Sequence, residues 1–526
     1  MADEKDRLLD LDEEGEIGEP EIVDDEHTCI QRPKVYIYEE AIKTTGFGLF
    51  HYLLLCACGW ADASDAVEIL SVSFLMPHAK EDMNLHSFEL GLLGASIFLG
   101  MMIGSYFWGS LADIRGRKAV LVYSLLMNGI FGLLSSFMQS FWPFLLMRFL
   151  SGIGVGGSMP VIFSYFCEFL PKNRRGAMLT LISMFWILGN IITAGLAWAI
   201  IPRHFGYFSD TFTYDSWRIF VAVCTIPSFT SSFTFVFLPE SPKFLLENGE
   251  ETVALSVLRK MYILNNRSKQ KADFPVQLLQ ASPEARKLLQ TRHSRKTLRS
   301  LLSQCKKNCR EIFTSTRKLF VPPHRKVSVC LLTIIFTLSF GYYGVWLWFP
   351  EIFKRVEVSG SACSVLPANL TSNSSDTDSS IYRDSFITAV SNFPGNLFAT
   401  LTIDKLGRKA LLGGSLLVSG CSVFFIWFLS SRAEVLAMSC IFGGISVIGW
   451  AALNVIGVEC YPTNMRATAV GMQSVVNRIA AITGNLVFGV FIDLYCAVPI
   501  LAVAVLLAFG GIITVFLPNT KGMDLK

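Results

Sequence analysis

Long runs of apolar residues, separated by short polar segments, dominate this sequence. Twelve of these runs have about the 20 residues that a helix needs to cross the hydrocarbon core of a bilayer. They cover residues 48–76, 90–112, 119–140, 143–170, 177–201, 218–238, 327–350, 383–402, 410–430, 435–457, 467–492 and 497–517. Because lipid supplies no hydrogen-bond partners to a peptide backbone, each run is expected to form a helix. The pattern therefore predicts an all-α membrane protein with twelve transmembrane helices.

The spans form two groups of six on either side of a long polar segment. The predicted organisation is an acidic tail over 1–45, a six-helix half over 46–239, a basic loop over 240–326, a second six-helix half over 327–518 and a short tail over 519–526. The second half contains a polar segment, 351–381, between its first two spans. Of the 526 residues, 52% are hydrophobic and 17% are charged, which leaves too little polar surface for a soluble protein of this size.

Charge is distributed unevenly along the chain. The first 27 residues hold 13 Asp or Glu against two Lys or Arg, so they lack the basic start and apolar core of a cleavable signal peptide. Residues 240–326 hold 19 Lys or Arg against seven Asp or Glu. Because cytosolic loops carry the excess of positive charge, this basic loop and both termini are expected in the cytosol. The segment 351–381 is then expected to face the lumen or the exterior.

The cysteines predict no metal site. Thirteen are scattered, mostly within spans, where they behave as small apolar residues. Cys363 is the one that stands out in the non-cytosolic loops, and one cysteine makes no disulfide framework. Cys305 and Cys309 in the basic loop lack the neighbours of a metal site, so neither a metal nor another cofactor is expected.

Two loop motifs occur twice, and both copies are 291 residues apart. The first copy contains Asp113, Gly116, Arg117, Glu168 and Arg175, and the second contains Asp404, Gly407, Arg408, Glu459 and Arg466. A single offset that relates two motifs indicates that the second half repeats the first. This doubled pattern resembles the gating loops of the major facilitator superfamily, in which substrate is handled between two six-helix halves.

The doubled motifs are expected to act in conformational change and not to touch substrate. Gly109 is expected to let two helices approach closely, and Asp113 to cap the neighbouring helix or pair with Arg117. In the second copy Thr400 stands at the glycine position, so closer packing is expected in the first half. The opposite charges predict ion-pair networks that hold one state and break in the other. The alternative is a static set of surface pairs, each worth under about 1 kcal/mol.

Four charged residues of the first and fourth spans are candidates for a functional role, because a charge within a span needs a partner or water. Asp62, Asp65 and Glu68 follow each other at steps of three residues, which places them on one face of the first span. Arg148 precedes the glycine-rich run SGIGVGG in the fourth span, and this pattern resembles the second signature of proton-linked carriers. Asp65 or Glu68 is expected to bind a proton or cation. The alternative is a buried pair with Arg148 that fixes helix packing.

Aromatic and amide side chains of other spans add to a predicted site for a small organic solute. The candidates are Trp186, Tyr343, Trp348, Trp450 and Asn454, with Asn477 and Arg478 nearby in the eleventh span. Trp348 also fits an interfacial aromatic belt.

Short signals in the polar segments predict sorting and modification. Glu4, Leu8 and Leu9 form an acidic dileucine arrangement of the kind that clathrin adaptors read, although a chance match in an acidic tail is the alternative. Asn369 and Asn373 begin two glycosylation tripeptides in the segment expected to face the lumen.

Longer stretches resemble the synaptic vesicle glycoprotein 2 family. They include FLGMMIGSYFWGSLADIRGR, RFLSGIGVGGSMPVIFSYFCEFL, PESPKFLLENG, GYYGVWLWFP and FGGISVIGWAALNVIGVECYP. The resemblance implies a twelve-span major facilitator fold, glycosylation and residence in secretory vesicles. It also implies transport-related roles for Asp65 and Glu68, and places Trp186 and Trp348 in a small-molecule pocket. Position 454 has Asn where the family has an acid, and the large luminal domain of that family is missing.

These observations favour a secondary transporter that moves a small organic solute by alternating access, with protons or cations as candidate coupling ions. The expected place is the membrane of cytoplasmic, endosomal or synaptic-like vesicles, or the plasma membrane. The alternative is a non-transporting vesicle protein that acts in trafficking or binds a partner. An enzyme is not expected, because the sequence lacks a nucleophile–base set, a metal cluster and a phosphate loop. No nucleic-acid partner is expected.

Overall fold

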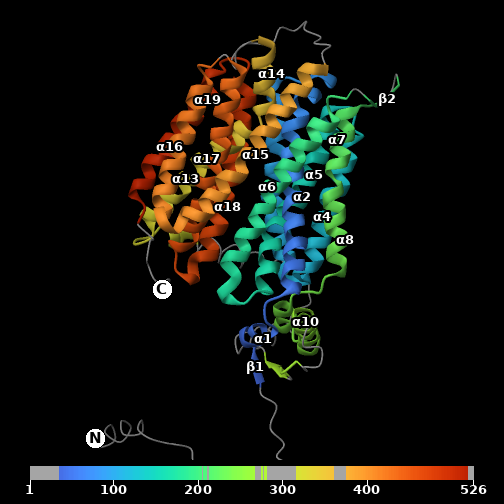
Figure 1. The fold of residues 1–526 in the computed structure, drawn as a ribbon, viewed down its shortest axis with the longest axis vertical. Helices are drawn as coiled ribbons and strands as arrows, with labels where there is room; N and C mark the ends of the chain where they lie inside the picture. Colours follow the sequence, from blue (N-terminus) through green and yellow to red (C-terminus); the bar gives the residue numbers. More distant parts are fainter. Residues whose placement is uncertain are drawn as a thin grey trace, which may run out of the picture.

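A computed structural model describes residues 35–203, 205–209, 212–266, 274–276, 278–280, 316–359, 375–429 and 431–518. The described helices form a tall bundle (Figure 1). Its two ends are named here after the helices found there. The α14 end, at the top of Figure 1, carries α14 (Phe349–Ser359), and the α10 end, at the bottom, carries α10 (Glu251–Asn265).

The N-terminal half contains six spans, of which the last is a pair of helices. They are α2 (Leu49–Asp82), α3 (Ser87–Arg115), α4 (Arg117–Ser136), α5 (Phe141–Glu168), α6 (Arg175–Ile200, preceded by the 3-10 turn Lys172–Arg174), and α7 (Ser216–Cys224) with α8 (Ile226–Phe237). A short antiparallel hairpin, β2 (Tyr207–Phe208) with β3 (Thr213–Tyr214), joins α6 to α7 at the α14 end.

The C-terminal half repeats this arrangement. Its spans are α13 (Arg325–Trp346), α15 (Ser375–Leu406), α16 (Arg408–Ile426), α17 (Arg432–Glu459), α18 (Thr463–Phe491) and α19 (Ala497–Ile513), which ends in the 3-10 turn Thr514–Phe516. Ten of the described helices are long and apolar enough to cross a membrane. The more polar α2 and α15 complete the twelve spans, so the predicted all-α fold is confirmed.

The structure corrects two details of the second half. The seventh span ends at Trp346 and not at residue 350, and the chain turns at Leu347 into α14. The polar segment 351–381 therefore begins and ends in helices, since α15 starts at Ser375. The predicted boundaries of this segment as a loop are wrong. Its acids and bases are spaced for one amphipathic helix, which an apolar-run criterion does not detect.

The two halves pack against each other along two pairs of helices, α3 with α18 and α6 with α15. At Gly91 of α3, an added Cβ would lie 2.7 Å from the Asn485 carbonyl oxygen and 2.8 Å from Gly489 Cα of α18. Only hydrogen atoms fit between the backbones at this crossing, so these glycines allow the halves to meet closely.

A small module at the α10 end is fastened to the N-terminal half. It contains α1 (Tyr38–Thr45), α9 (Pro242–Glu247), α10 and the parallel pair of β1 (Val35–Ile37) with β4 (Leu278–Gln280). The Asn265 amide donates to the carbonyls of Thr45 and Gly46 at 3.2 and 3.1 Å and accepts from the Phe50 backbone N–H at 3.1 Å. One side chain of α10 therefore holds the junction between α1 and α2.

Several predictions concern residues outside the described ranges. They are the sorting residues Glu4, Leu8 and Leu9, the glycosylation residues Asn369 and Asn373, and Cys305, Cys309 and Cys363. Among described cysteines, Cys496 is disulfide-bonded at the α14 end. The expectation that no disulfide forms is wrong. Cys496 borders the last apolar run, so its sequence context is that of a buried thiol.

Candidate functional site

Three acidic side chains of α2 are buried in the middle of the N-terminal half. Asp62, Asp65 and Glu68 are each at most 1% exposed. Their spacing of three residues puts them on neighbouring turns of one helix face. Both carboxylate oxygens of Asp62 lack a partner among the described residues.

Glu68 and Arg148 form a buried ion pair between α2 and α5. Glu68 Oε1 lies 2.7 Å from Arg148 Nη1, and the same guanidinium nitrogen lies 3.2 Å from Ser71 Oγ. The guanidinium also stands over the Phe144 ring, 5.5 Å from its centre. Glu68 Oε2, Arg148 Nε and Arg148 Nη2 have no partner in the described part of the chain. The pair is therefore only partly satisfied by protein, which is costly in a dry interior.

Ser151 connects this ion pair to two more helices. Its hydroxyl lies 2.6 Å from Glu68 Oε1 and 2.9 Å from Asn128 Oδ1 of α4, and the Asn128 amide donates to Ser228 Oγ of α8 at 3.1 Å. A hydroxyl has one proton, so Ser151 donates to one of its two neighbours at a time. Ser151 therefore links Glu68 of α2 to Asn128 of α4.

Asp65 has a separate partner on α5. The Ser158 hydroxyl lies 2.8 and 2.7 Å from the two carboxylate oxygens of Asp65. Glycines bring these helices together: a Cβ on Gly154 would lie 2.7 Å from the Asn128 backbone nitrogen. The run SGIGVGG thus positions Ser151 and Ser158 against the acids of α2.

Arg478 of α18 brings the C-terminal half to the same region. Its side chain is 6% exposed, and its Nη2 lies 3.2 Å from Met159 Sδ of α5. Arg478 Nε and Nη1 have no partner among the described residues. Asp65 and Tyr343 are the groups that act electrostatically on this guanidinium. A thioether is a poor acceptor for an arginine, so most of its donor capacity is unused.

The predicted aromatic residues fall into two sets. Tyr343 contacts the rings of Phe98 and Trp450, with centres 4.8 and 6.2 Å apart, and joins the Arg478 region. The Trp450 indole nitrogen has no partner in the described chain. Trp348 is fully buried and stacks on Phe488 with ring centres 5.9 Å apart.

Trp186 and Asn454 are not joined to these groups. Trp186 is half-buried, Asn454 is exposed, and within the described residues no hydrogen bond, ion pair or ring contact links either one to the acids or to Arg478. The sequence analysis named Arg478 only as a neighbour of the predicted site, beside Asn477 in an apolar run. A charge at the centre of a span was the available signal.

The doubled loop motifs form matching contacts at the α10 end. Arg117 Nη2 lies 3.2 Å from Glu168 Oε1 and 3.8 Å from Asp113 Oδ1, and Arg408 Nη2 lies 3.4 Å from Glu459 Oε1. The loop arginines also match, because Arg175 donates to the Leu170 carbonyl at 3.0 Å and Arg466 to the Tyr461 carbonyl at 3.5 Å. The side chain of Asp404 lies outside the described residues.

Gly116 and Gly407 stand at equivalent positions before α4 and α16. Their φ angles are +98° and +88°, a conformation that side-chain-bearing residues avoid. Gly109 differs from its prediction, because an added Cβ there would meet nothing within 4 Å. The predicted close approach at Gly109 is wrong. It occurs five and nine residues earlier, where a Cβ on Gly104 or Gly100 would lie within 3 Å of the backbone of α5.

Glu240 contacts the first loop motif, although the motif itself did not reveal this contact. Its carboxylate accepts from the backbone N–H groups of Arg117 and Lys118 at 3.1 Å each. These are the first free donors of α4, where a negative charge is favourable. In the second half Lys409 instead donates to the Val515 and Leu517 carbonyls at 2.6 and 2.8 Å. Among the described residues, the contacts beside the start of α16 therefore differ from those beside the start of α4.

Ion pairs join the two halves at the α14 end. Lys80 Nζ lies 3.1 Å from Glu351 Oε1, and Lys354 Nζ lies 2.5 Å from Glu81 Oε1. Below them, the Ser73 hydroxyl donates to the Leu347 carbonyl at 2.9 Å. We call Lys80, Glu81, Glu351 and Lys354 the α14 latch. It closes this end of the bundle in the present conformation.

Asp493 supports the latch from the turn after α18. Arg355 Nη2 of α14 lies 2.5 Å from Asp493 Oδ1. Burial raises the pKa of Asp493, but hydrogen bonds from Ser87 and Arg355 and the charge of Lys80 outweigh it, so the pKa lies below its ordinary value. Ser87 belongs to the N-terminal half, which makes the charged form of Asp493 part of the closure.

Comparison with known proteins places these features in a wider group. The family model described as "Sugar (and other) transporter" matches residues 63–526. Synaptic vesicle glycoprotein 2C of Rattus norvegicus is 31% identical over 92% of this chain and 80% of its own length. Synaptic vesicle glycoprotein 2A of Homo sapiens is 31% identical over 93% of this chain and 80% of its own length. The resemblance inferred from the motifs is confirmed.

Solved structures share the fold at lower identity. The xylose transporter XylE from E. coli, in a partially occluded inward-open conformation, has a TM-score of 0.64 at 16% identity, covering 90% of this chain and all of XylE. The proton:xylose symporter XylE bound to 6-bromo-6-deoxy-D-glucose has a TM-score of 0.63 at 19% identity, covering 90% of this chain and 97% of XylE.

Proposed function

Because the chain belongs to the sugar (and other) transporter family, with synaptic vesicle glycoprotein 2 proteins among its relatives, we propose that it moves a small organic solute across a vesicle membrane by alternating access. The observation that carries this proposal is the buried set of Asp62, Asp65, Glu68 and Arg148 facing Arg478 of the other half. Several of their polar atoms have no partner among the described residues. Burying charged side chains at such depth costs free energy, so charged residues within spans usually serve ion or substrate binding.

The C-terminal half would supply the groups that recognise the solute. Arg478 and the Trp450 indole offer unused donors, and the Tyr343 ring offers an apolar face beside them. Solute bound there would touch α18 and α13 directly and α5 through Met159. Contact with both halves is what allows a solute to favour one conformation over the other.

Glu68 is proposed as the proton-binding group. In its charged form it accepts from Arg148 and Ser151, and in its protonated form it donates to Ser151 while Ser151 donates to Asn128. Protonation removes the charge that holds Arg148, so it weakens the contact between α2 and α5. A proton would in this way alter the packing of the helix that also carries the latch residues Lys80 and Glu81.

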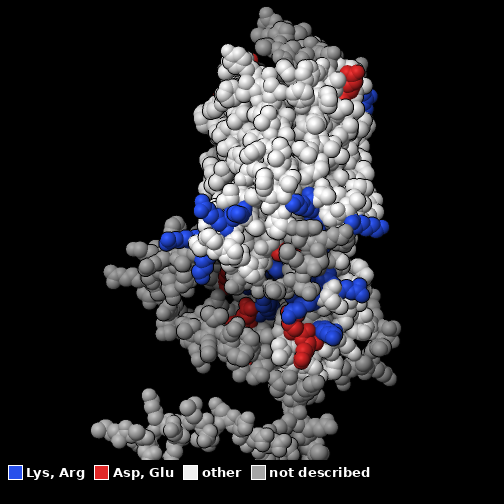
Figure 2. Space-filling view, turned by 90° about the vertical axis from the view of Figure 1, so that its left-hand side faces the viewer, with Lys and Arg blue, Asp and Glu red and all other residues white. Residues whose placement is uncertain are grey.

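We place the α10 end in the cytosol. Figure 2 shows one face whose broad middle is free of charged side chains, with Lys and Arg gathered toward the α10 end below it. An excess of Lys and Arg marks the cytosolic side of a membrane protein. The disulfide at Cys496 lies at the opposite end, as expected for a surface exposed to an oxidising lumen or exterior. The present structure is then the state closed to the lumen.

The test is uptake by purified protein in liposomes under an imposed pH gradient. Candidate solutes are chosen first by thermal stabilisation with a panel of sugars and organic ions, beginning with D-xylose, because a bound solute stabilises the folded state. Uptake should follow the proton gradient in the unmodified protein. Glu68→Gln should lower gradient-driven uptake by at least about a hundredfold, the lower end of the range for loss of a positioned acid or base.

Glu89→Gln is the matched control, because Glu89 is an acid of the neighbouring helix that contacts the backbone N–H and the ring of His86 next to it. It should leave uptake unchanged. If solutes bind but none is transported by the unmodified protein, the transporter proposal is wrong and a non-transporting binding role takes its place. If uptake occurs but ignores both the pH gradient and Glu68→Gln, proton coupling through Glu68 is wrong.

A further inference from the structure

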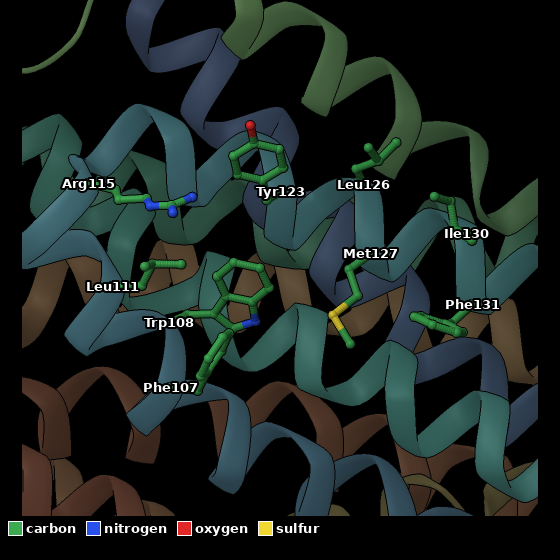
Figure 3. A pocket seen from close by; sticks show the side chains of 9 residues that line it. All are labelled: Phe107, Trp108, Leu111, Arg115, Tyr123, Leu126, Met127, Ile130 and Phe131. Carbon is green, nitrogen blue, oxygen red and sulfur yellow. The ribbon is translucent and has the colours of Figure 1, made fainter. Parts of the chain in front are cut away.

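A groove opens on the outer surface of the N-terminal half, away from the buried charges. It lies between α3 and α4 and has a volume of about 450 Å³ (Figure 3). Phe107 and Trp108 of α3 line one side, and Tyr123, Met127 and Phe131 of α4 line the other. Phe107 and Tyr123 are 55% and 53% exposed, so the groove faces the surroundings of the bundle and not its interior. Both helices are membrane spans, and those surroundings are lipid.

The groove has one charged end. Arg115, the last residue of α3, lies at the α10 end of the groove, and Figure 3 shows its guanidinium turned back over the groove toward Tyr123. Arg115 is exposed, and none of the ion pairs between described residues involves it. An arginine held at the mouth of an apolar groove is suited to an anionic group, above all phosphate.

A second polar group lies deeper in the same groove. The Trp108 side chain is 7% exposed, and its indole N–H has no acceptor among the described residues. Figure 3 shows the nitrogen turned toward the side where Met127 lies. Trp108 is seven residues from Arg115, about 10 Å along the helix. A buried indole N–H normally has an acceptor. A ligand that fits this groove would therefore carry a hydrogen-bond acceptor near Trp108 and an anionic group near Arg115.

We propose that this groove binds an anionic phospholipid of the cytosolic leaflet. The phosphate contacts Arg115, an ester carbonyl accepts from Trp108, and an acyl chain lies between Phe107 and Phe131. From Tyr123 to Phe131 the groove follows α4 for about 12 Å, close to the depth of one leaflet. A sterol or a fatty acid has one polar group and cannot contact both Arg115 and the Trp108 N–H. The assignment to the cytosolic leaflet, where anionic lipids gather, rests on the proposed orientation.

The lipid would lie beside the first gating motif. Trp108 packs against α5, since a Cβ on Gly157 would fall within 3 Å of the indole ring. Asp113 and Arg117 follow on the next turns toward the α10 end. A bound lipid therefore contacts the surface of α3, the helix that also crosses α18 of the other half.

The experiment uses the full-length protein purified in detergent and titrated with dioleoyl phosphatidylserine, dioleoyl phosphatidylcholine, oleic acid or cholesterol, with binding followed by native mass spectrometry. Phosphatidylserine should bind most tightly, and a photoreactive phosphatidylserine should label peptides of α3 and α4. Arg115→Gln should weaken phosphatidylserine binding about fivefold, the effect of roughly 1 kcal/mol per basic residue. Trp108→Phe should weaken both phospholipids by a similar factor, because one hydrogen bond is lost.

Arg325→Gln is the matched control, since it removes one exposed arginine at the α10 end of the other half. It should leave binding and labelling unchanged. Equal binding of phosphatidylserine and phosphatidylcholine to the unmodified protein, or labelling outside α3 and α4, would overturn the proposal. So would oleic acid or cholesterol displacing phosphatidylserine at equal concentration.

Discussion

Glu68 Oε1 lies 2.7 Å from Arg148 Nη1, and neither side chain is more than 1% exposed. Removing one partner of such a pair leaves an uncompensated buried charge, whereas replacing both with apolar residues of similar size is often neutral. The two members should therefore be strongly coupled in stability.

Arg148→Met alone should destabilise the protein by about 3–5 kcal/mol, and the double variant Glu68→Leu with Arg148→Met should recover most of that loss. The measurement is thermal unfolding in detergent. Both variants should fail in gradient-driven uptake, which separates the stability of the fold from transport. If the double variant is less stable than the single one, the pair is not the coupled unit described above.

The α14 latch should respond to charge reversal. Glu81→Lys places two lysines together at the pair with Lys354 and should shift the population away from the closed conformation. Because Glu81 is 60% exposed on its side chain, the shift should be modest, about two- to fivefold. Spin-label distances across the α14 end measure it.

Adding Lys354→Glu to that variant restores opposite charges and should restore the closed population. Glu89→Lys, at the same end but within one half, should change nothing. A latch variant with unchanged distances would show that the closure depends on the apolar contacts beneath it, such as those of Trp348.

Asp493 predicts how the closed state depends on pH. Its pKa is lowered from the ordinary 3.8 because hydrogen bonds from Ser87 and Arg355, with the charge of Lys80, outweigh the effect of burial. A group with a lowered pKa contributes fully above its ordinary pKa and loses its contribution as pH falls through the lowered value. The Asp493 contribution to closure should thus persist at neutral and mildly acidic pH and disappear below about pH 4.

Spin-label distances measured from pH 7 to pH 3 check this expectation. Asp493→Asn should remove the contribution at every pH and flatten the part of the profile below pH 4. A transition centred near pH 6 would point to another group and contradict the role of Asp493.

Substitution of the equivalent glycines Gly116 and Gly407 should destabilise the fold to different extents. Gly407→Ala meets no neighbour within 4 Å, so it should cost only the backbone strain of a positive φ, about 1–3 kcal/mol. Gly116→Ala has the same strain, and its Cβ would also displace the Glu240 carboxylate. Thermal unfolding should show Gly116→Ala as the more damaging change. Equal losses would mean that Glu240 moves away without cost.

The sequence predicts the spans because hydropathy alone decides which segments can lie in lipid. It also predicts ion-pair networks at the doubled motifs, but the specific pairs, Arg117 with Glu168 and Arg408 with Glu459, come from the structure. Lys354 and Arg355 were missed for a different reason. Their segment is polar, so a search for apolar runs does not detect its helix. A polar segment between two spans is then interpreted as a loop.

The contacts between the two halves could also not be predicted from the sequence. Nothing in the pattern around Arg478 indicates that it meets Met159, because the two residues lie in different halves and their contact depends on how the halves dock. Gly109 shows the opposite error: a motif glycine was assigned the close approach that Gly100 and Gly104 provide. A small residue permits contact, but neighbouring helices decide where contact occurs.

Asn265 ties α10 to the first turn of α2, and Arg175 adds an ion pair with Glu39 of α1 at 3.2 Å. These contacts attach the small module of α1, α9 and α10 firmly to the N-terminal half. When one half tilts against the other, this module should move together with the N-terminal half. A fluorescent reporter joined to this module should therefore move at the α10 end if the halves tilt as the proposed transport cycle requires.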